Sequence, residues 1–230
     1  MAVHLIFDLL AAICALAAAW AAHRWRVAET PGFARIDGGY GIALVAGAAL
    51  GGYGLGTLNL WLSATPGIGR SILGALAGAI AAIEIYKARR GITGSTGLIF
   101  VASFPVSVAI GRIGCYLSGL PDMTHGTPTA LPWGHDFGDG VPRHPVQLYE
   151  SAAMTAFLIY AAWAAHRRDA FFMAKGFYLM IGYYAAQRFL WEFLKPYATL
   201  IGPFNLFHLV CLALAAYAAV MLARGRDVRT

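Results

Sequence analysis

The chain has 230 residues, of which 59% are hydrophobic and only 12% are charged, and its mean hydropathy is +0.63. A soluble domain usually carries about 25% charged residues, and a water-soluble globule needs polar groups to cover its outside. The composition therefore argues against a disordered chain, a nucleic-acid-binding module and a disulfide-stapled secreted domain. It predicts a single membrane domain over residues 1–230.

Seven apolar segments follow one another along the chain, and each is long enough to cross a bilayer, which takes about 20 residues. We expect transmembrane helices at about residues 5–22, 40–62, 71–87, 97–117, 146–165, 175–195 and 203–223. The connection from about residue 118 to 145 is rich in proline and glycine, so we expect an ordered loop there. Glycines four residues apart in the second and third segments predict close helix packing.

Lysines and arginines are distributed unequally over the connections. Twelve follow segments one, three, five and seven, and three lie on the opposite side. The twelve are Arg24, Arg26, Arg35, Lys87, Arg89, Arg90, Arg167, Arg168, Lys175, Arg224, Arg226 and Arg229, and the three are Arg70, Arg143 and Lys195. Because cytoplasmic loops carry the excess of basic residues, the N-terminus is predicted outside and the C-terminus in the cytoplasm. This distribution accounts for the net charge of +6 without a nucleic-acid partner.

Charged residues inside predicted spans are costly and point to function by default. Arg112, Glu150, Arg188 and Glu192 are expected at similar depths, near the outer ends of the fourth, fifth and sixth segments. Two arginines on different helices suit a phosphate, whose oxygens match the guanidinium fork. Two structural interpretations stay open: Arg188 and Glu192 form only an intrahelical pair, and Arg112 extends to the membrane surface.

The predicted outer loop adds several titratable side chains, and three cysteines lie elsewhere. The loop residues are Asp122, His125, His135, Asp136, Asp139, Arg143 and His144. Since the chain contains no HExxH or CxxC pattern, we expect neither a metal site nor a cofactor. Cys14, Cys115 and Cys211 all lie in apolar runs, which argues against disulfides.

Three motifs stand in order between residues 111 and 150, namely GRIGCYLSG (111–119), GTPTALPWG (126–134) and RHPVQLYE (143–150). They resemble the signature region of the prolipoprotein diacylglyceryl transferases, and RFLWEFLK (188–195) resembles that family's R-x-x-x-E-x-x-R pattern. The resemblance implies a multi-pass enzyme of the bacterial inner membrane that acts in lipoprotein biosynthesis. Such an enzyme transfers a diacylglyceryl group from phosphatidylglycerol to a prolipoprotein cysteine thiol.

This chemistry needs fixed positive charge for the leaving phosphate and a base for the thiol. The expected catalytic residues are Arg112, His125, His144, Glu150 and Arg188, and the expected substrate-binding residues are Asp122, Arg143, Gln147, Tyr149, Glu192 and Lys195. The base is left open among His125, His144, Glu150 and Asp122. Glu150 has an alternative role, which is to fix an arginine or the Gln147–Tyr149 segment.

The sequence departs from the family pattern at several positions. Leu73, Gly74 and Ala75 stand where the family has His-Gly-Gly, so the histidine often proposed as the base is absent. Cys115 replaces an asparagine, Leu120 replaces a glutamate, and an arginine after position 120 is missing. These changes keep two alternatives open: a transferase with the same donor but another acceptor, and a non-catalytic lipid-binding protein. We expect Cys115 to fill packing space, with a nucleophilic role as its alternative.

Overall fold

The computed structural model describes residues 2–27 and 36–224 of the chain. Within these residues it contains seven α-helices: α1 (Ala2–Ala22), α2 (Gly38–Leu62), α3 (Ile72–Arg90), α4 (Phe100–Ser118), α5 (Val146–His166), α6 (Ala170–Glu192) and α7 (Leu206–Ala223). Shorter elements join them: the π-helical turn η1 (His23–Val27), the 3-10 turn η3 (Leu120–Asp122), and the strands β1 (His135–Asp136), β2 (Pro142–Arg143), β3 (Thr199–Ile201) and β4 (Phe204–Asn205).

These helices confirm the predicted all-α class and the seven helical segments. The largest difference in position is at α6, which begins five residues before the predicted start near residue 175. Asp169 caps this early turn, because its side chain accepts a hydrogen bond from the backbone N–H of Phe172 at 2.6 Å. Three of the basic residues used to predict orientation, Arg35, Arg226 and Arg229, lie outside the described residues.

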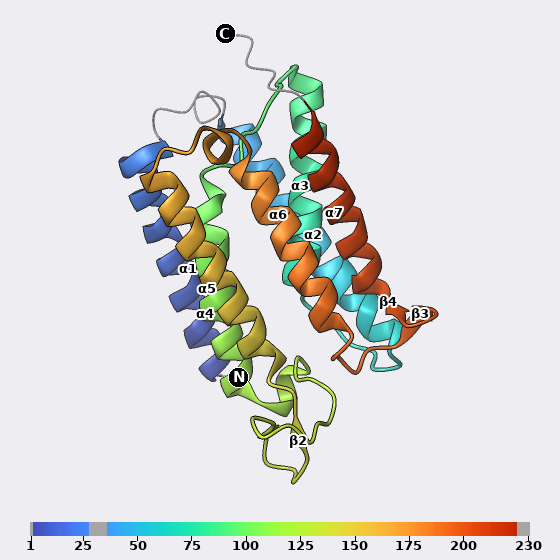
Figure 1. Cartoon of the computed structure of the whole chain (residues 1–230). Coiled ribbons are helices and arrows are strands. Elements are labelled where there is room, and N and C mark those ends of the chain that lie inside the picture. The colour runs from blue at the N-terminus through green and yellow to red at the C-terminus, as the bar shows by residue number, and fades with distance from the viewer. Residues whose placement is uncertain (1, 28–35, 225–230) are drawn as a thin grey trace.

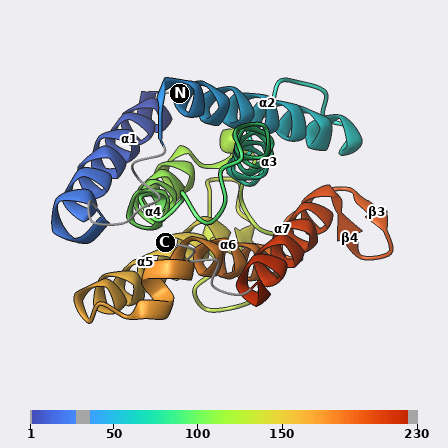
Figure 2. The ribbon, with the colours of Figure 1, turned by 90° about the horizontal axis from the view of Figure 1, so that it is seen from above.

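The helices lie side by side along one common direction (Figure 1). Along one side of the bundle α1 packs on α4, α4 on α5, and α5 on α6, while α6 also packs on α7. On the other side α2 packs on α3, which touches α7. Seen from above, α3 and α4 lie between the α1–α2 pair and the α5–α7 group (Figure 2). The start of α1 and the loop between α4 and α5 lie at one end, and the end of α7 lies at the other.

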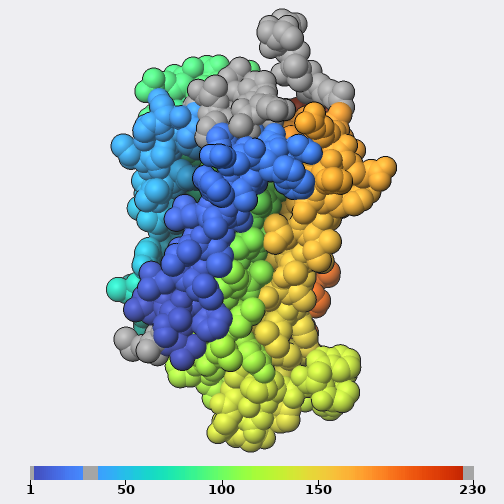
Figure 3. Space-filling model, turned by 90° about the vertical axis from the view of Figure 1, so that its left-hand side faces the viewer, coloured from blue at the N-terminus to red at the C-terminus, as the bar shows by residue number. Residues whose placement is uncertain are grey.

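The loop between α4 and α5 is not a continuous helix. Its strands β1 and β2 pair in antiparallel fashion, with His135 opposite Arg143. The backbone N–H of Thr127 donates to the carbonyl of Leu194 at 2.6 Å, and His144 and Thr127 are joined by a second backbone bond. The loop protrudes beyond the ends of the helices (Figure 3), and these bonds hold it against the end of α6.

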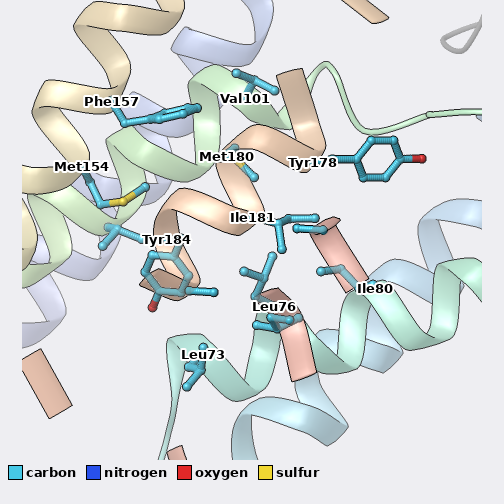
Figure 4. Close-up of a cluster of buried hydrophobic side chains, with 14 of the residues drawn as sticks. Leu73, Leu76, Ile80, Val101, Met154, Phe157, Tyr178, Met180, Ile181 and Tyr184 are labelled. Carbon is cyan, nitrogen blue, oxygen red and sulfur yellow. The ribbon is translucent and has the colours of Figure 1, made fainter. Parts of the chain in front are cut away.

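A cluster of buried apolar side chains fills the centre of the bundle (Figure 4). It draws on α3, α4, α5, α6 and α7, and Met154, Ile181 and Tyr184 are among its completely buried members. Leu73, at the start of α3, belongs to this cluster and exposes only 1% of its surface. The position that matches the family's histidine is therefore part of the hydrophobic core.

Four helical segments of the described chain are long and apolar enough to cross a membrane. They are Val3–Val27, Gly38–Leu62, Phe100–Ser118 and Leu206–Ala223. Large apolar side chains also cover the outside of the helices, and Leu16, Ile42 and Leu50 each expose more than 70% of their surface. A water-soluble monomer rarely exposes so much contiguous apolar surface, so these faces fit contact with lipid.

The close approach of α2 and α3 depends on glycine, as the four-residue spacing predicted. A Cβ atom on Gly51 would meet the carbonyl oxygen of Gly74 and would lie 2.8 Å from the Cα of Gly78. A Cβ atom on Gly47 would likewise meet the backbone of Gly78. Larger residues at these positions would separate the two helices.

We expect Gly51→Ala to lower the free energy of unfolding by about 1–3 kcal/mol, the usual cost of overpacking. Gly54→Ala is the matched control, because nothing lies within 4 Å of a Cβ atom at that position of the same helix. Thermal unfolding of both variants in detergent measures the difference. Equal stability of the two variants would contradict this account of the α2–α3 contact.

Candidate functional site

A buried network of five charged side chains lies near the loop end of the bundle. Glu150 of α5 is at its centre: its carboxylate contacts Nε of Arg112 at 2.7 Å, Nζ of Lys195 at 3.1 Å, and Nη1 of Arg188. Nη2 of Arg188 also contacts Glu192 at 2.9 Å. None of the five residues exposes more than 5% of its surface. Three cations thus face two carboxylates, which leaves one net positive charge in a buried place.

The sequence positions these groups through helix geometry. Arg188 and Glu192 are four residues apart and so share one face of α6. Arg112 lies in the last two turns of α4, and Glu150 lies in the first two turns of α5, so the loop that joins these helices brings them to the same level. The sequence predicted similar depths for these charged side chains, and the structure places them at the same level of the bundle. The intrahelical pair of Arg188 and Glu192 is one contact of a larger network.

Arg112 and Arg188 line a cavity of about 550 Å³ at the same end of the bundle. Other polar residues in its wall are His4, Asp8, Asn59, Arg70, Asp122 and Thr124. An adjoining cavity of about 340 Å³ has a mostly apolar wall that includes Leu76, Ile80 and Phe104. The two cavities share the lining residues Ala48, Ile72 and Ala75. This combination of a polar and an apolar compartment suits a molecule with a charged head and hydrocarbon chains.

Two more of the sequence-predicted residues lie beside the network. Gln147 is completely buried on α5, and its Nε2 donates to Oγ1 of Thr124 at 3.3 Å. Asp122 lines the larger cavity, and its Oδ1 contacts Nε2 of His4 at 2.9 Å. Together with the five charged residues, they make up the part of the predicted site that the structure brings together.

The four remaining predicted residues, His125, Arg143, His144 and Tyr149, belong neither to the charged network nor to the wall of the larger cavity. Arg143 pairs with Asp139 through two contacts of 2.7 Å, and its guanidinium holds the pKa of the Asp139 carboxyl below its usual value. Nδ1 of His144 lies 3.4 Å from the Tyr149 hydroxyl, and Nδ1 of His125 lies 3.1 Å from the carbonyl of Gly126. These contacts join residues of the loop to one another and to Tyr149 of α5, and none of them involves Arg112 or Arg188.

The sequence placed Asp8 of the first segment near the outer polar cavity, but it did not single out His4 in the same cavity wall. His4 and Asp8 are four residues apart, and Nδ1 of His4 contacts Oδ2 of Asp8 at 2.9 Å. Arg70, which precedes α3, reaches the same carboxylate at 3.4 Å. Two polar side chains on one face of an otherwise apolar helix are a signal that could have indicated this site.

Cys115 lies one turn beyond Arg112 on α4 and is buried. Its Sγ is 4.0 Å from Nη1 of Arg112 and 3.9 Å from Nε2 of His4. It therefore fills the space between the arginine and the histidine at the cavity wall.

Comparison with known proteins gives matches over most of the chain. The profile of the family described as prolipoprotein diacylglyceryl transferase matches residues 9–224. A phosphatidylglycerol–prolipoprotein diacylglyceryl transferase of Geobacter sulfurreducens is 36% identical over 148 residues, which are 60% of this chain and 54% of that protein. Proteins of the same name from Cupriavidus metallidurans and Nitratidesulfovibrio vulgaris (strain Miyazaki F) are 39% and 33% identical over 101 and 168 residues.

The shares covered differ among these relatives. The Cupriavidus match covers 43% of this chain and 36% of the relative, and the Nitratidesulfovibrio match covers 69% and 61%. The chain thus spans about half the length of the curated relatives it matches. No solved structure matches it significantly. Because the family profile extends over almost the whole helical bundle, the chain belongs to the prolipoprotein diacylglyceryl transferase family.

Proposed function

We propose that this chain transfers a diacylglyceryl group from a phosphatidylglycerol-like phospholipid to the cysteine thiol of a prolipoprotein. The observation that carries this proposal is the buried network with one net positive charge, which faces the larger cavity through Arg112 and Arg188. The phosphodiester of phosphatidylglycerol carries one negative charge and balances it. The names of the curated relatives supply the donor and the acceptor.

The two adjoining cavities support a lipid as donor. Glu150 engages Nε of Arg112, and Nη1 makes a long contact of 4.0 Å with Sγ of Cys115. The Nη side of this guanidinium therefore remains accessible to phosphate oxygens. The apolar cavity then offers a place for hydrocarbon chains beside the phosphate position. An unpaired positive charge in a buried site is costly, so a bound anionic headgroup stabilises the site as well as being recognised by it.

The reaction follows from this placement. The thiol sulfur attacks the glyceryl carbon next to the phosphate, the carbon–oxygen bond breaks, and glycerol phosphate leaves with the electron pair. The arginines stabilise the charge that grows on the leaving oxygen, because their positions are fixed before the reaction. With both carboxylate oxygens of Glu150 engaged by cations, its geometry favours the positioning of the arginines over acceptance of a proton.

We further propose that all seven helices cross a bacterial inner membrane as a single domain, with the site in the outer leaflet. The described basic residues of the predicted cytoplasmic side support this orientation, because they cluster at the helix ends opposite the α4–α5 loop. They are Arg24, Arg26, Lys87, Arg89, Arg90, Arg167, Arg168, Lys175 and Arg224. The loop and the entrance to the polar cavity then face the periplasm.

One observation favours a second candidate, a transferase with the same donor but another acceptor. Leu73 is buried in the hydrophobic core, so no titratable group stands at the position of the family's histidine. The arginines that would bind the phosphate match the family pattern, whereas residues expected near the acceptor differ from it.

A complementation experiment separates these functions. We expect the chain to restore growth to bacteria depleted of their own prolipoprotein diacylglyceryl transferase. In vesicles, the purified protein should convert a lipobox peptide to its thioether while releasing one glycerol phosphate per peptide. Phospholipid turnover without peptide modification would support another acceptor. Phospholipid binding without turnover would indicate a lipid-binding protein.

We expect Arg112→Lys to reduce turnover at least tenfold, since lysine keeps the charge but lacks the bidentate fork. Arg112→Ala and Arg188→Ala should each lose roughly 100-fold or more, the typical cost of removing a group that stabilises the leaving charge. Arg167→Ala, on an exposed arginine beyond the far end of α5, is the control. Thermal unfolding of each variant separates loss of function from loss of fold. Near-normal turnover in both alanine variants at the site would exclude the arginines as phosphate ligands.

The proposed orientation predicts which engineered cysteines are accessible from outside the cell. Ala130→Cys, on an exposed loop position, should react with a membrane-impermeant maleimide in intact cells, and Arg89→Cys should react only after lysis. The parent chain gives the background from Cys14, Cys115 and Cys211. The reverse pattern of labelling would overturn the orientation.

A further inference from the structure

The imidazole of His4 lies between two carboxylates in the wall of the larger cavity. Its Nδ1 contacts Oδ2 of Asp8 at 2.9 Å, and its Nε2 contacts Oδ1 of Asp122 at 2.9 Å. The His4 and Asp122 side chains are 20% and 10% exposed, so both reach the cavity while being mostly shielded from solvent. Nδ1 thus contacts a residue of the same helix, α1, and Nε2 contacts Asp122 in the loop that follows α4.

Close packing of α1 on α4 puts His4 at this place. A Cβ atom on Gly114 would overlap the side chain of Phe7, so only glycine allows α1 to approach α4 at this level. One turn before Phe7, His4 then reaches Sγ of Cys115 at 3.9 Å, and Cys115 in turn lies 4.0 Å from Nη1 of Arg112. The side chain of Cys115 therefore lies between His4 and Arg112, the arginine proposed to bind the phosphate.

We propose that His4 is the proton acceptor for the attacking thiol, with Asp8 orienting its ring and Asp122 sharing its proton. This inference rests on the proposed function. Catalytic histidines typically have one ring nitrogen fixed by a carboxylate while the other faces the reacting group. His4 shows the first of these features, because Nδ1 is held by Asp8. Its Nε2 contacts Asp122 in the wall of the cavity, so the thiol proton is received by the His4–Asp122 pair.

The proton and electron balance of the step is simple. In the resting site Nδ1–H of His4 donates to Asp8, and one proton is shared between Nε2 and the Asp122 carboxylate. The thiol proton passes to this pair as the sulfur–carbon bond forms, so that Nε2 and the Asp122 carboxyl then hold one proton each. The carbon–oxygen bond to phosphate breaks, and its electron pair leaves on glycerol phosphate. Water at the cavity mouth then takes the proton from the pair. The step needs no oxidant, reductant or metal.

The other candidate bases fit this role less well. Nδ1 of His125 contacts a carbonyl of the loop, Nδ1 of His144 contacts the Tyr149 hydroxyl, and neither histidine lines the cavity. Glu150 is engaged by three cations, and protonation would break these contacts. Among the residues that line the cavity, His4 is the histidine, and it lies beside the arginines.

A pH profile tests the assignment, and the groups that face His4 can be named for the residues that the structure describes. The charged and titratable groups around it are Asp8 on its own helix, Arg70 before α3, Arg112 and Cys115 on α4, and Asp122 in η3. His4→Gln leaves these groups in place but removes the proton acceptor. An acceptor thiol ionises by itself near pH 8.5, so at high pH the reaction no longer needs a base.

The experiment compares wild type, His4→Gln, Asp122→Asn and His166→Gln in vesicles of phosphatidylglycerol with a lipobox peptide. General base catalysis typically contributes 10²–10⁴-fold, so His4→Gln should lose about 100-fold in turnover at pH 7. Its defect should shrink as the pH rises above 8.5, while its KM for phosphatidylglycerol stays within twofold of wild type. Asp122→Asn should show a smaller loss with the same trend. His166→Gln, at the opposite end of the bundle, should match wild type.

Each outcome has one meaning. If wild type forms no thioether product, the proposed function fails, and this inference fails with it. If wild type forms product and His4→Gln does so equally fast, only the role of His4 is overturned. A loss in His4→Gln that is the same at every pH also overturns it, because a structural role would not be relieved by ionisation of the thiol. The ligand atoms of His4, Cys115 and Asp122 lie within 4.8 Å of one another. Binding of one zinc ion per chain by these three residues would also overturn the role of His4, because a metal-bound Nε2 cannot accept a proton.

Discussion

The carboxylate of Glu150 is the contact on which the charged site depends. It is completely buried and joins Arg112 of α4, Arg188 of α6 and Lys195 beyond α6. A shift of one of these helices by one turn, about 5.4 Å, would leave a buried charge without its partner. Breaking a buried ion pair in this way typically costs about 3–5 kcal/mol. The same contacts that set the relative positions of α4, α5 and α6 along the bundle therefore also hold the cations in place before phosphate binds.

The seven helices and the common depth of the charges could be predicted because both depend on position along the chain. Apolar length sets the span, and the distance of Arg112, Glu150 and Arg188 from the nearest polar connection sets their level. The partners could not be predicted in the same way. Whether Glu150 turns towards α4 and α6 depends on helix rotation and packing, whereas the pair of Arg188 and Glu192 follows from spacing on one helix.

The side-chain contacts of the loop residues could not be predicted, because a loop has no helical or strand period. Arg143 and His144 stand in the third motif, and His125 directly precedes the second. Backbone bonds fold the loop so that the side chains of His125 and Arg143 contact other loop residues, while that of His144 contacts Tyr149 of α5. The short strands β1 to β4 were not predicted, since two or three residues carry no measurable alternation. His4 escaped notice because it lies at the start of an apolar helix, far from the motifs in sequence.

Leu73 is buried in the hydrophobic core, whereas the polar face of α1 lines the larger cavity. Leu73 contributes hydrocarbon to the core formed by α3 and α6, so the wall of the cavity near α3 carries no base. On the opposite wall, α1 packs on α4, the helix that carries Arg112 and Cys115. A proton acceptor on α1 can therefore serve the same phosphate position from another direction, without disturbing the contacts of Glu150. In the proposed mechanism the arginines that bind the phosphate and the histidine that receives the proton therefore lie on separate helices.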